Sequence, residues 1–144
     1  MNRIAIEILI IVLLILVNGL FAMAEIAIVS ARKTRLQQQA QEGNKKALVA
    51  LELANAPNQF LATIQIGITL VGIVAGAFGG ATIAEKLADA LRQVPLLAPY
   101  GEAIGVAVVV LAITYRTLVI GELVPKRLGL NNAEHVAARL APLM

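Results

Sequence analysis

The sequence predicts an all-α integral membrane protein with three transmembrane helices, amphipathic helices beside the membrane and an N-terminus on the outer side. Of its 144 residues, 59% are hydrophobic and only 15% are charged, which is more apolar than a soluble domain of this size. Ile8–Ala24 and Asn58–Ala84 contain no charged residue, and Ala103–Gly121 contains only Arg116. Apolar runs of about 20 residues are long enough to cross a hydrocarbon core of about 30 Å.

The polar segments beside these runs predict short surface helices. The segment after the first run is helix-prone but is interrupted at Gly43-Asn44, which predicts two helices. Asn132 is expected to be the N-cap of a last amphipathic helix. The expected helices are about 4–30, 58–84 and 103–124 in the membrane, and about 31–55 and 132–140 on its cytoplasmic surface.

The basic residues predict the orientation in the membrane. Cytoplasmic loops carry an excess of Lys and Arg, and here the basic residues gather after the first and third helices. We therefore expect both of these ends in the cytoplasm, in a multi-pass protein of the cytoplasmic (inner) membrane. The basic residues are Arg32, Lys33, Arg35, Lys45 and Lys46 after the first helix, Lys126, Arg127 and Arg139 after the third, and only Lys86 and Arg92 between the second and third.

A secretory signal peptide is an alternative interpretation of the first helix. Arg3, the apolar run and Ala22-Met23-Ala24 resemble the basic, hydrophobic and cleavage regions of such a peptide. Glu7, placed soon after Arg3, is untypical of a signal peptide and favours a transmembrane helix.

The composition excludes several classes of function. The chain has no Cys, so disulfides, thiolate metal sites and cysteine nucleophiles are excluded. Its single His, His135, rules out a histidine-rich zinc site within one chain. The chain is basic, but three Phe, two Tyr and no Trp provide no stacking platform, so we expect no nucleic-acid partner.

The segment GELVPKR, Gly121–Arg127, carries the strongest chemical signal. Pro125 cannot donate a hydrogen bond to the carbonyl of Gly121, and its ring crowds that carbonyl, so the helix is expected to kink or unwind. The freed oxygen would lie beside the Glu122 carboxylate, and such oxygens suit magnesium, calcium or sodium. Lys126 lies at the spacing of an intrahelical ion pair with Glu122. The alternative is a helix end whose proline and basic residues meet the headgroups.

Polar residues in the first helix are further candidates, because polar groups are costly in hydrocarbon. Asn18, Ala22 and Glu25 share one face of that helix. Arg116 of the third helix is expected either to reach the membrane surface or to pair with Glu25.

The second helix carries a stripe of polar and small residues. Gln65, Thr69, Gly72 and Gly76 recur on one face. Small residues let helix backbones approach closely, which predicts packing in a bundle or dimer. The same residues can also line an ion path with carbonyl and side-chain oxygens.

Four segments together resemble the transmembrane domain of the CNNM/CorC family of magnesium transporters, also called hemolysin-related. They are EIAIVSARKTRL, TIQIGITLVGIVAGAFGGATIAE, ITYRTLVIGELVPKRLGL and NNAEHVAARLAPLM, and the resemblance covers essentially the whole chain. It implies a homodimer with three transmembrane helices and a cytoplasmic helical belt in each subunit. Paired CBS domains and a C-terminal CorC domain would follow, and residues 1–144 contain neither, so we expect a domain cut from a longer protein.

The resemblance also implies magnesium efflux, with sodium as the expected coupling ion, through an inward-facing acidic cavity. Glu122 matches the acidic residue of the GELxPK motif, and Lys126 matches its lysine. Gly121 and Pro125 match the distorted turn whose carbonyls help to bind the ion. Gln65, Thr69 and Gly72 match the polar side of the second helix in part, and Asn18 and Glu25 are supporting candidates.

The chain departs from the family pattern at several expected ligands. Ala22 and Ala24 stand where serines are expected, and Ile68 and Gly72 stand where asparagines are expected. Two alternatives to magnesium transport therefore stay open. One is a membrane anchor that dimerises and positions cytoplasmic CBS regulatory modules, and the other is export of another cation such as a polyamine. None of these functions involves covalent chemistry, so no enzymatic activity is expected.

Overall fold

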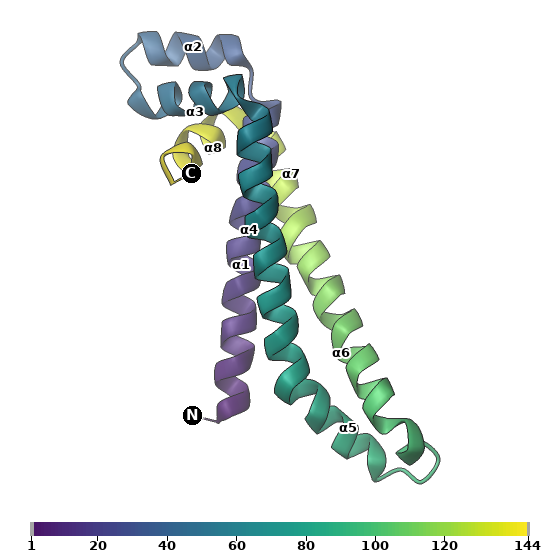
Figure 1. Cartoon of the computed structure of the whole chain (residues 1–144). Helices are drawn as coiled ribbons and strands as arrows, with labels where there is room; N and C mark the ends of the chain where they lie inside the picture. The colour runs from purple at the N-terminus through teal and green to yellow at the C-terminus, as the bar shows by residue number, and fades with distance from the viewer. Residues whose placement is uncertain (1, 144) are drawn as a thin grey trace.

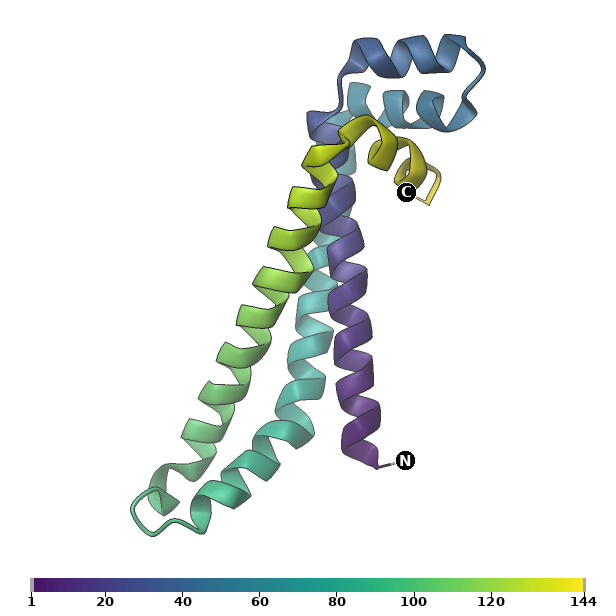
Figure 2. The same ribbon diagram turned by 180° about the vertical axis from the view of Figure 1, so that it is seen from behind.

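The structure, a computed structural model, describes residues 2–143 and confirms the all-α fold (Figure 1). Within these residues three helical segments are long and apolar enough to cross a membrane: Arg3–Ser30, Pro57–Phe78 and Ala98–Asn131. The first is α1 and the second is α4, and the two lie side by side. The third contains α6 (Gly101–Leu118) and α7 (Val124–Asn131). It lies against α1 near the C-terminus of the chain and diverges from α1 and α4 toward the other end (Figures 1 and 2).

Short helices gather at the end where the chain terminates, which we call the belt end. They are α2 (Lys33–Gln41), α3 (Lys45–Asn55) and α8 (Ala133–Leu140). The break between α2 and α3 falls at the predicted position, where Gly43 has a φ of 93° that favours glycine. Asn44 then caps α3, because its side chain accepts hydrogen bonds from the backbone N–H groups of Lys46 and Ala47.

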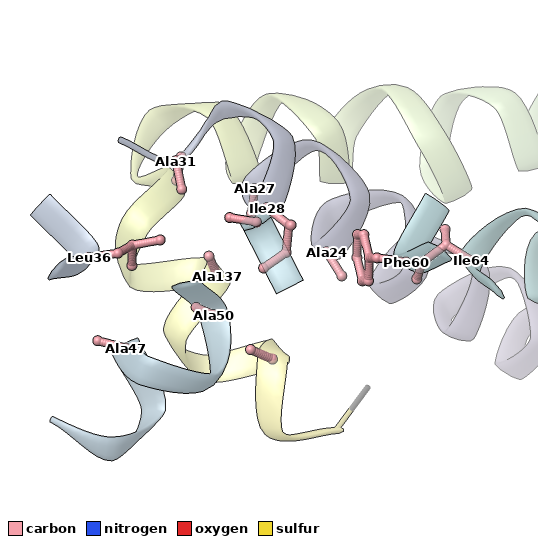
Figure 3. Close-up of a cluster of buried hydrophobic side chains, with 13 residues drawn as sticks. Ala24, Ala27, Ile28, Ala31, Leu36, Ala47, Ala50, Phe60, Ile64 and Ala137 are labelled. Carbon is pink, nitrogen blue, oxygen red and sulfur yellow. The ribbon is translucent and has the colours of Figure 1, made fainter. Parts of the chain in front are cut away.

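The main buried cluster also lies at the belt end, where α1, α3, α4 and α8 meet (Figure 3). Leu36 of α2 is fully buried in it, and Phe60 and Ile64 of α4 are 5% and 2% exposed. Most of the other members are alanines, which let helix backbones approach closely. Ala24 belongs to this cluster, and Ala22 is equally buried.

The second membrane helix extends beyond its predicted end at residue 84. After α4 the chain makes a π-helical turn, η1 (Gly79–Ile83), and continues into α5 (Ala84–Arg92). A π turn takes up one extra residue, so the helix can bend without ending. In Figure 1 α5 leans away from α1 toward the connection with α6, an end of the bundle that we call the hairpin end.

Glu134 ties α8 to the end of α1. Asn132 is the N-cap of α8 by position, as predicted, but its side chain makes no capping hydrogen bond, because its backbone (φ −147°, ψ 63°) lies outside the usual capping region. Glu134 is 9% exposed and accepts a hydrogen bond of 3.2 Å from the backbone N–H of Arg32. The backbone N–H of Glu134 itself, that of Arg32 and the charges of Arg35 and Arg32 lower the pKa of this carboxyl, and together they outweigh the opposing effect of burial.

A Glu134→Gln variant is expected to lose part of the acid sensitivity of the fold. A carboxyl with a lowered pKa stabilises the fold above its ordinary pKa of 4.5, and this contribution is lost as the pH falls through the lowered value. Thermal unfolding in detergent between about pH 5 and pH 3 should therefore be steeper for the wild type than for the variant. The exposed Glu52 gives the control Glu52→Gln, and equal slopes for all three proteins would contradict the assignment.

Candidate functional site

The predicted break at Pro125 is a π-helical turn and not a helix end. The turn η3 (Val119–Leu123) joins α6 to α7, and the helix then continues to Asn131, so the predicted end at residue 124 is wrong. Pro125 has no N–H and crowds the preceding turn. The wider π turn accommodates the ring, and the helix does not have to end.

The carbonyl of Gly121, freed by Pro125, has a partner on α1. The side-chain amide of Asn18 donates to it at 3.1 Å, and Asn18 is only 1% exposed. Glycines permit this approach, since a Cβ atom built at Gly19 would lie 3.0 Å from Cγ of Pro125. The other amide atom, Oδ1 of Asn18, is buried and has no hydrogen-bond partner within residues 2–143. A carbonyl-type oxygen therefore remains available beside η3.

An Asn18→Leu variant is expected to lower the free energy of unfolding by about 1–2 kcal/mol. Leucine has a similar size but cannot donate to Gly121, which leaves a buried carbonyl unpaired. Denaturant unfolding in detergent measures the loss. Thr69→Val is a matched control, because the Thr69 hydroxyl lies on an exposed face, and its effect should stay within about 0.5 kcal/mol. Equal losses in the two variants would contradict a special role for Asn18.

Lys126 pairs with Glu25 of α1, at 3.3 Å between Nζ and Oε2. Two predictions are therefore wrong in the part of the chain that the structure describes: the pair of Glu122 with Lys126 and the pair of Glu25 with Arg116. The extra residue of η3 changes the rotation of α7, so Lys126 faces α1. Arg116 lies apart from Glu25, on an apolar groove of about 390 Å³ between α1 and α6.

Glu122 is half-buried and has no salt-bridge partner among the described residues. It lines a groove of about 370 Å³ between the second and third membrane helices. The facing wall is the glycine side of the second helix, where Gly72, Gly76 and Gly80 are exposed and a Cβ atom would meet nothing within 4 Å. The groove therefore brings one carboxylate against an open, small-residue surface.

The structure brings some of the candidate residues to this groove and leaves others outside it. Gly72 does share the groove with Glu122, as the stripe suggested. Gln65 and Thr69 are exposed on α4 and do not line it, and the Thr69 hydroxyl donates to the Gln65 carbonyl at 2.8 Å. Thr114 and Thr117 line the groove but were not predicted. Their spacing of three residues, one turn before Gly121, was the available signal.

The groove offers few ligands for a bare metal ion. Across residues 2–143 no three His, Cys, Asp or Glu side chains gather as metal ligands. Among the residues that line the groove, Glu122, Thr114 and Thr117 carry side-chain oxygen atoms. A carboxylate and hydroxyls of this kind bind cations by charge and by hydrogen bonding, with water completing the shell of a metal ion.

Comparison with known proteins shows which family this chain resembles. Residues 9–144 match the family model described as cyclin M transmembrane N-terminal domain. UPF0053 protein sll0260 of Synechocystis is 54% identical over 99% of this chain, which covers 32% of that protein. Proteins named polyamine export protein, from Haemophilus influenzae and Escherichia coli, are each 31% identical, over 95% and 93% of this chain and 32% and 30% of their own lengths. The chain therefore spans about a third of the length of these relatives.

Proposed function

Since this chain belongs to the family of cyclin M transmembrane N-terminal domains, we propose that it moves a small cation across the membrane and that Glu122 binds that cation. The observation that supports this proposal is the electrostatic position of Glu122. The nearest basic residue along the helix, Lys126, is held by Glu25 at 3.3 Å. An ionised carboxylate at membrane depth is costly without a partner, and a bound cation supplies the missing positive charge.

A linear polyamine is the cargo that suits this groove best. Its ammonium group can bind Glu122, while Thr114 and Thr117 accept hydrogen bonds from the remaining N–H groups. Its methylene chain can lie along the apolar and glycine walls. Two relatives that are 31% identical carry the name polyamine export protein, which supports this choice.

Magnesium is the second candidate cargo. The oxygen of Glu122 is a hard ligand, and the unpartnered Oδ1 of Asn18 is another buried oxygen beside the same π turn. A magnesium ion needs six oxygen ligands in near-octahedral geometry. Most of these ligands would be water molecules here, because Ala22, Ala24 and Ile68 stand at the positions of expected side-chain ligands.

Purified protein in liposomes tests the proposal directly. Liposomes loaded with radiolabelled putrescine and, separately, with magnesium and an indicator are compared with protein-free liposomes. We expect protein-dependent putrescine efflux that external magnesium competes with weakly. Efflux of magnesium without efflux of putrescine would support the transport proposal but would show that magnesium is the cargo. No flux of either cation would overturn the proposal and support the membrane-anchor alternative.

The setting that we propose for this activity is a homodimer in the cytoplasmic membrane, with the belt end in the cytoplasm. The basic residues after α1 and in α7 and α8 support this orientation. In the most apolar stretch of the third membrane segment, only 11% of the residues are buried within one chain. Its exposed surface is therefore available to lipid and to a second subunit. Regulatory CBS modules would follow α8 in the longer protein.

A further inference from the structure

A second polar cluster lies near the hairpin end of the bundle, about 16 Å along the axis of α1 from Asn18. Its centre is Glu7 of α1, which is 7% exposed. Glu7 faces the other π turn, η1, and its Oε1 atom accepts a hydrogen bond of 2.8 Å from the hydroxyl of Thr82. Arg3 also donates to Oε1, at 3.3 Å. The second oxygen, Oε2, is buried without a partner in the described part of the chain.

Packing alone does not account for this carboxylate. A buried carboxylate oxygen without a partner lowers the stability of the fold, and a neutral side chain at this position would lower it less. Arg3 does not satisfy Oε2, because it reaches only Oε1 and its side chain is 85% exposed. A small cation would satisfy the free oxygen directly.

The surroundings of Oε2 favour a monovalent cation. Thr82 donates its proton to Glu7 and keeps its lone pairs for another ligand. The turn η1 interrupts the α-helical pattern beside Glu7, and interrupted membrane helices use backbone carbonyls at such breaks to coordinate monovalent ions. One carboxylate supplies a single negative charge, and within residues 2–143 no cluster of three acidic or histidine side chains surrounds it.

We propose that Glu7, Thr82 and the π turn η1 form a binding site for a small monovalent metal cation of sodium size. Arg3 is a tethered competitor that neutralises Glu7 when the cation is absent. The site centres on Glu7 of α1 and does not include Glu122, although the groove of Glu122 extends to Gly80 within η1. The experiment that tests this site measures binding and not flux, so this proposal stands even if the transport proposal fails.

Sodium binding to the purified whole chain in detergent tests this site. Binding is measured with radiolabelled sodium, and by the shift in unfolding temperature when sodium chloride replaces choline chloride at constant ionic strength. We expect sodium to stabilise the wild type more than potassium or choline. Arg3→Gln should tighten binding by up to about fivefold, because it removes an exposed competing ion pair. Thr82→Val should weaken binding about tenfold.

Two further variants complete the test. Glu7→Gln should abolish saturable sodium binding, while Glu85→Gln, which changes an exposed carboxylate in α5, should leave it unchanged. Arg3 is the decisive position, because its exposed side chain can be replaced without disturbing the packing of Glu7. Unfolding temperatures that do not distinguish sodium from choline, in the wild type and in Arg3→Gln, would overturn the site. Equal or tighter binding of magnesium at Glu7 would overturn the monovalent class.

Discussion

A Glu122→Gln variant is expected to lower cation efflux about 100-fold while leaving the fold as stable as the wild type or slightly more stable. Glutamine keeps the size of the side chain but removes the charge that binds an ammonium group or a metal ion, and a charged hydrogen bond is worth about 1.5–3 kcal/mol. Glu122 has no salt-bridge partner in the described residues, so folding loses no ion pair. Efflux from liposomes and thermal unfolding should therefore change independently.

Two other carboxylates provide the comparisons. Glu52→Gln changes an exposed residue of α3 and should leave efflux unchanged. Glu25→Gln releases Lys126 from its ion pair and makes this cation available to Glu122, so efflux should fall even though Glu122 is intact. Unchanged efflux in Glu122→Gln would exclude Glu122 as the cation-binding residue. Unchanged efflux in Glu25→Gln would show that Lys126 does not control the charge of Glu122.

The parts of the fold that the sequence predicted follow from short-range physics. Long apolar runs require transmembrane helices whatever their neighbours are, and Gly43-Asn44 carries its own turn and cap within four residues. The freed carbonyl of Gly121 follows from the covalent structure of Pro125 alone. These features needed no knowledge of how the helices pack.

The incorrect predictions depend on helix rotation and on long-range contact. The pair of Glu122 and Lys126 assumed an uninterrupted α-helix, but the extra residue of η3 rotates the chain and gives Lys126 to Glu25. Gln65 and Thr69 were placed with Glu122, but they lie on a part of α4 that does not face the groove. The turn η1 contains no proline, and its Gly79-Gly80 pair weakens the helix locally without predicting a π turn. From the sequence, Glu7 served only to distinguish a transmembrane helix from a signal peptide, and no site was predicted there.

A Pro125→Ala variant is expected to lose efflux while the bundle remains folded. Alanine restores an N–H group four residues after Gly121, and this donor competes with Asn18 for the Gly121 carbonyl. Alanine is also favoured over proline in a helix interior by about 3 kcal/mol. This gain opposes the loss of the contact between Pro125 and Gly19. The π turn should therefore relax toward an α-helix.

The relaxed helix would carry Lys126 away from Glu25 and toward Glu122, the pairing that an α-helical spacing favours. Because the chain has no cysteine, the rotation can be measured by cross-linking Glu25→Cys to Lys126→Cys with a bifunctional thiol reagent, whose length replaces that of the two side chains. This cross-link should form readily with Pro125 and poorly with Pro125→Ala. Equal cross-linking and unchanged efflux in the two backgrounds would contradict control by the π turn. Efflux should recover when Lys126→Gln is added to Pro125→Ala. Such a recovery would identify the displaced lysine as the cause of the loss, because removing its charge removes the cation that competes for Glu122.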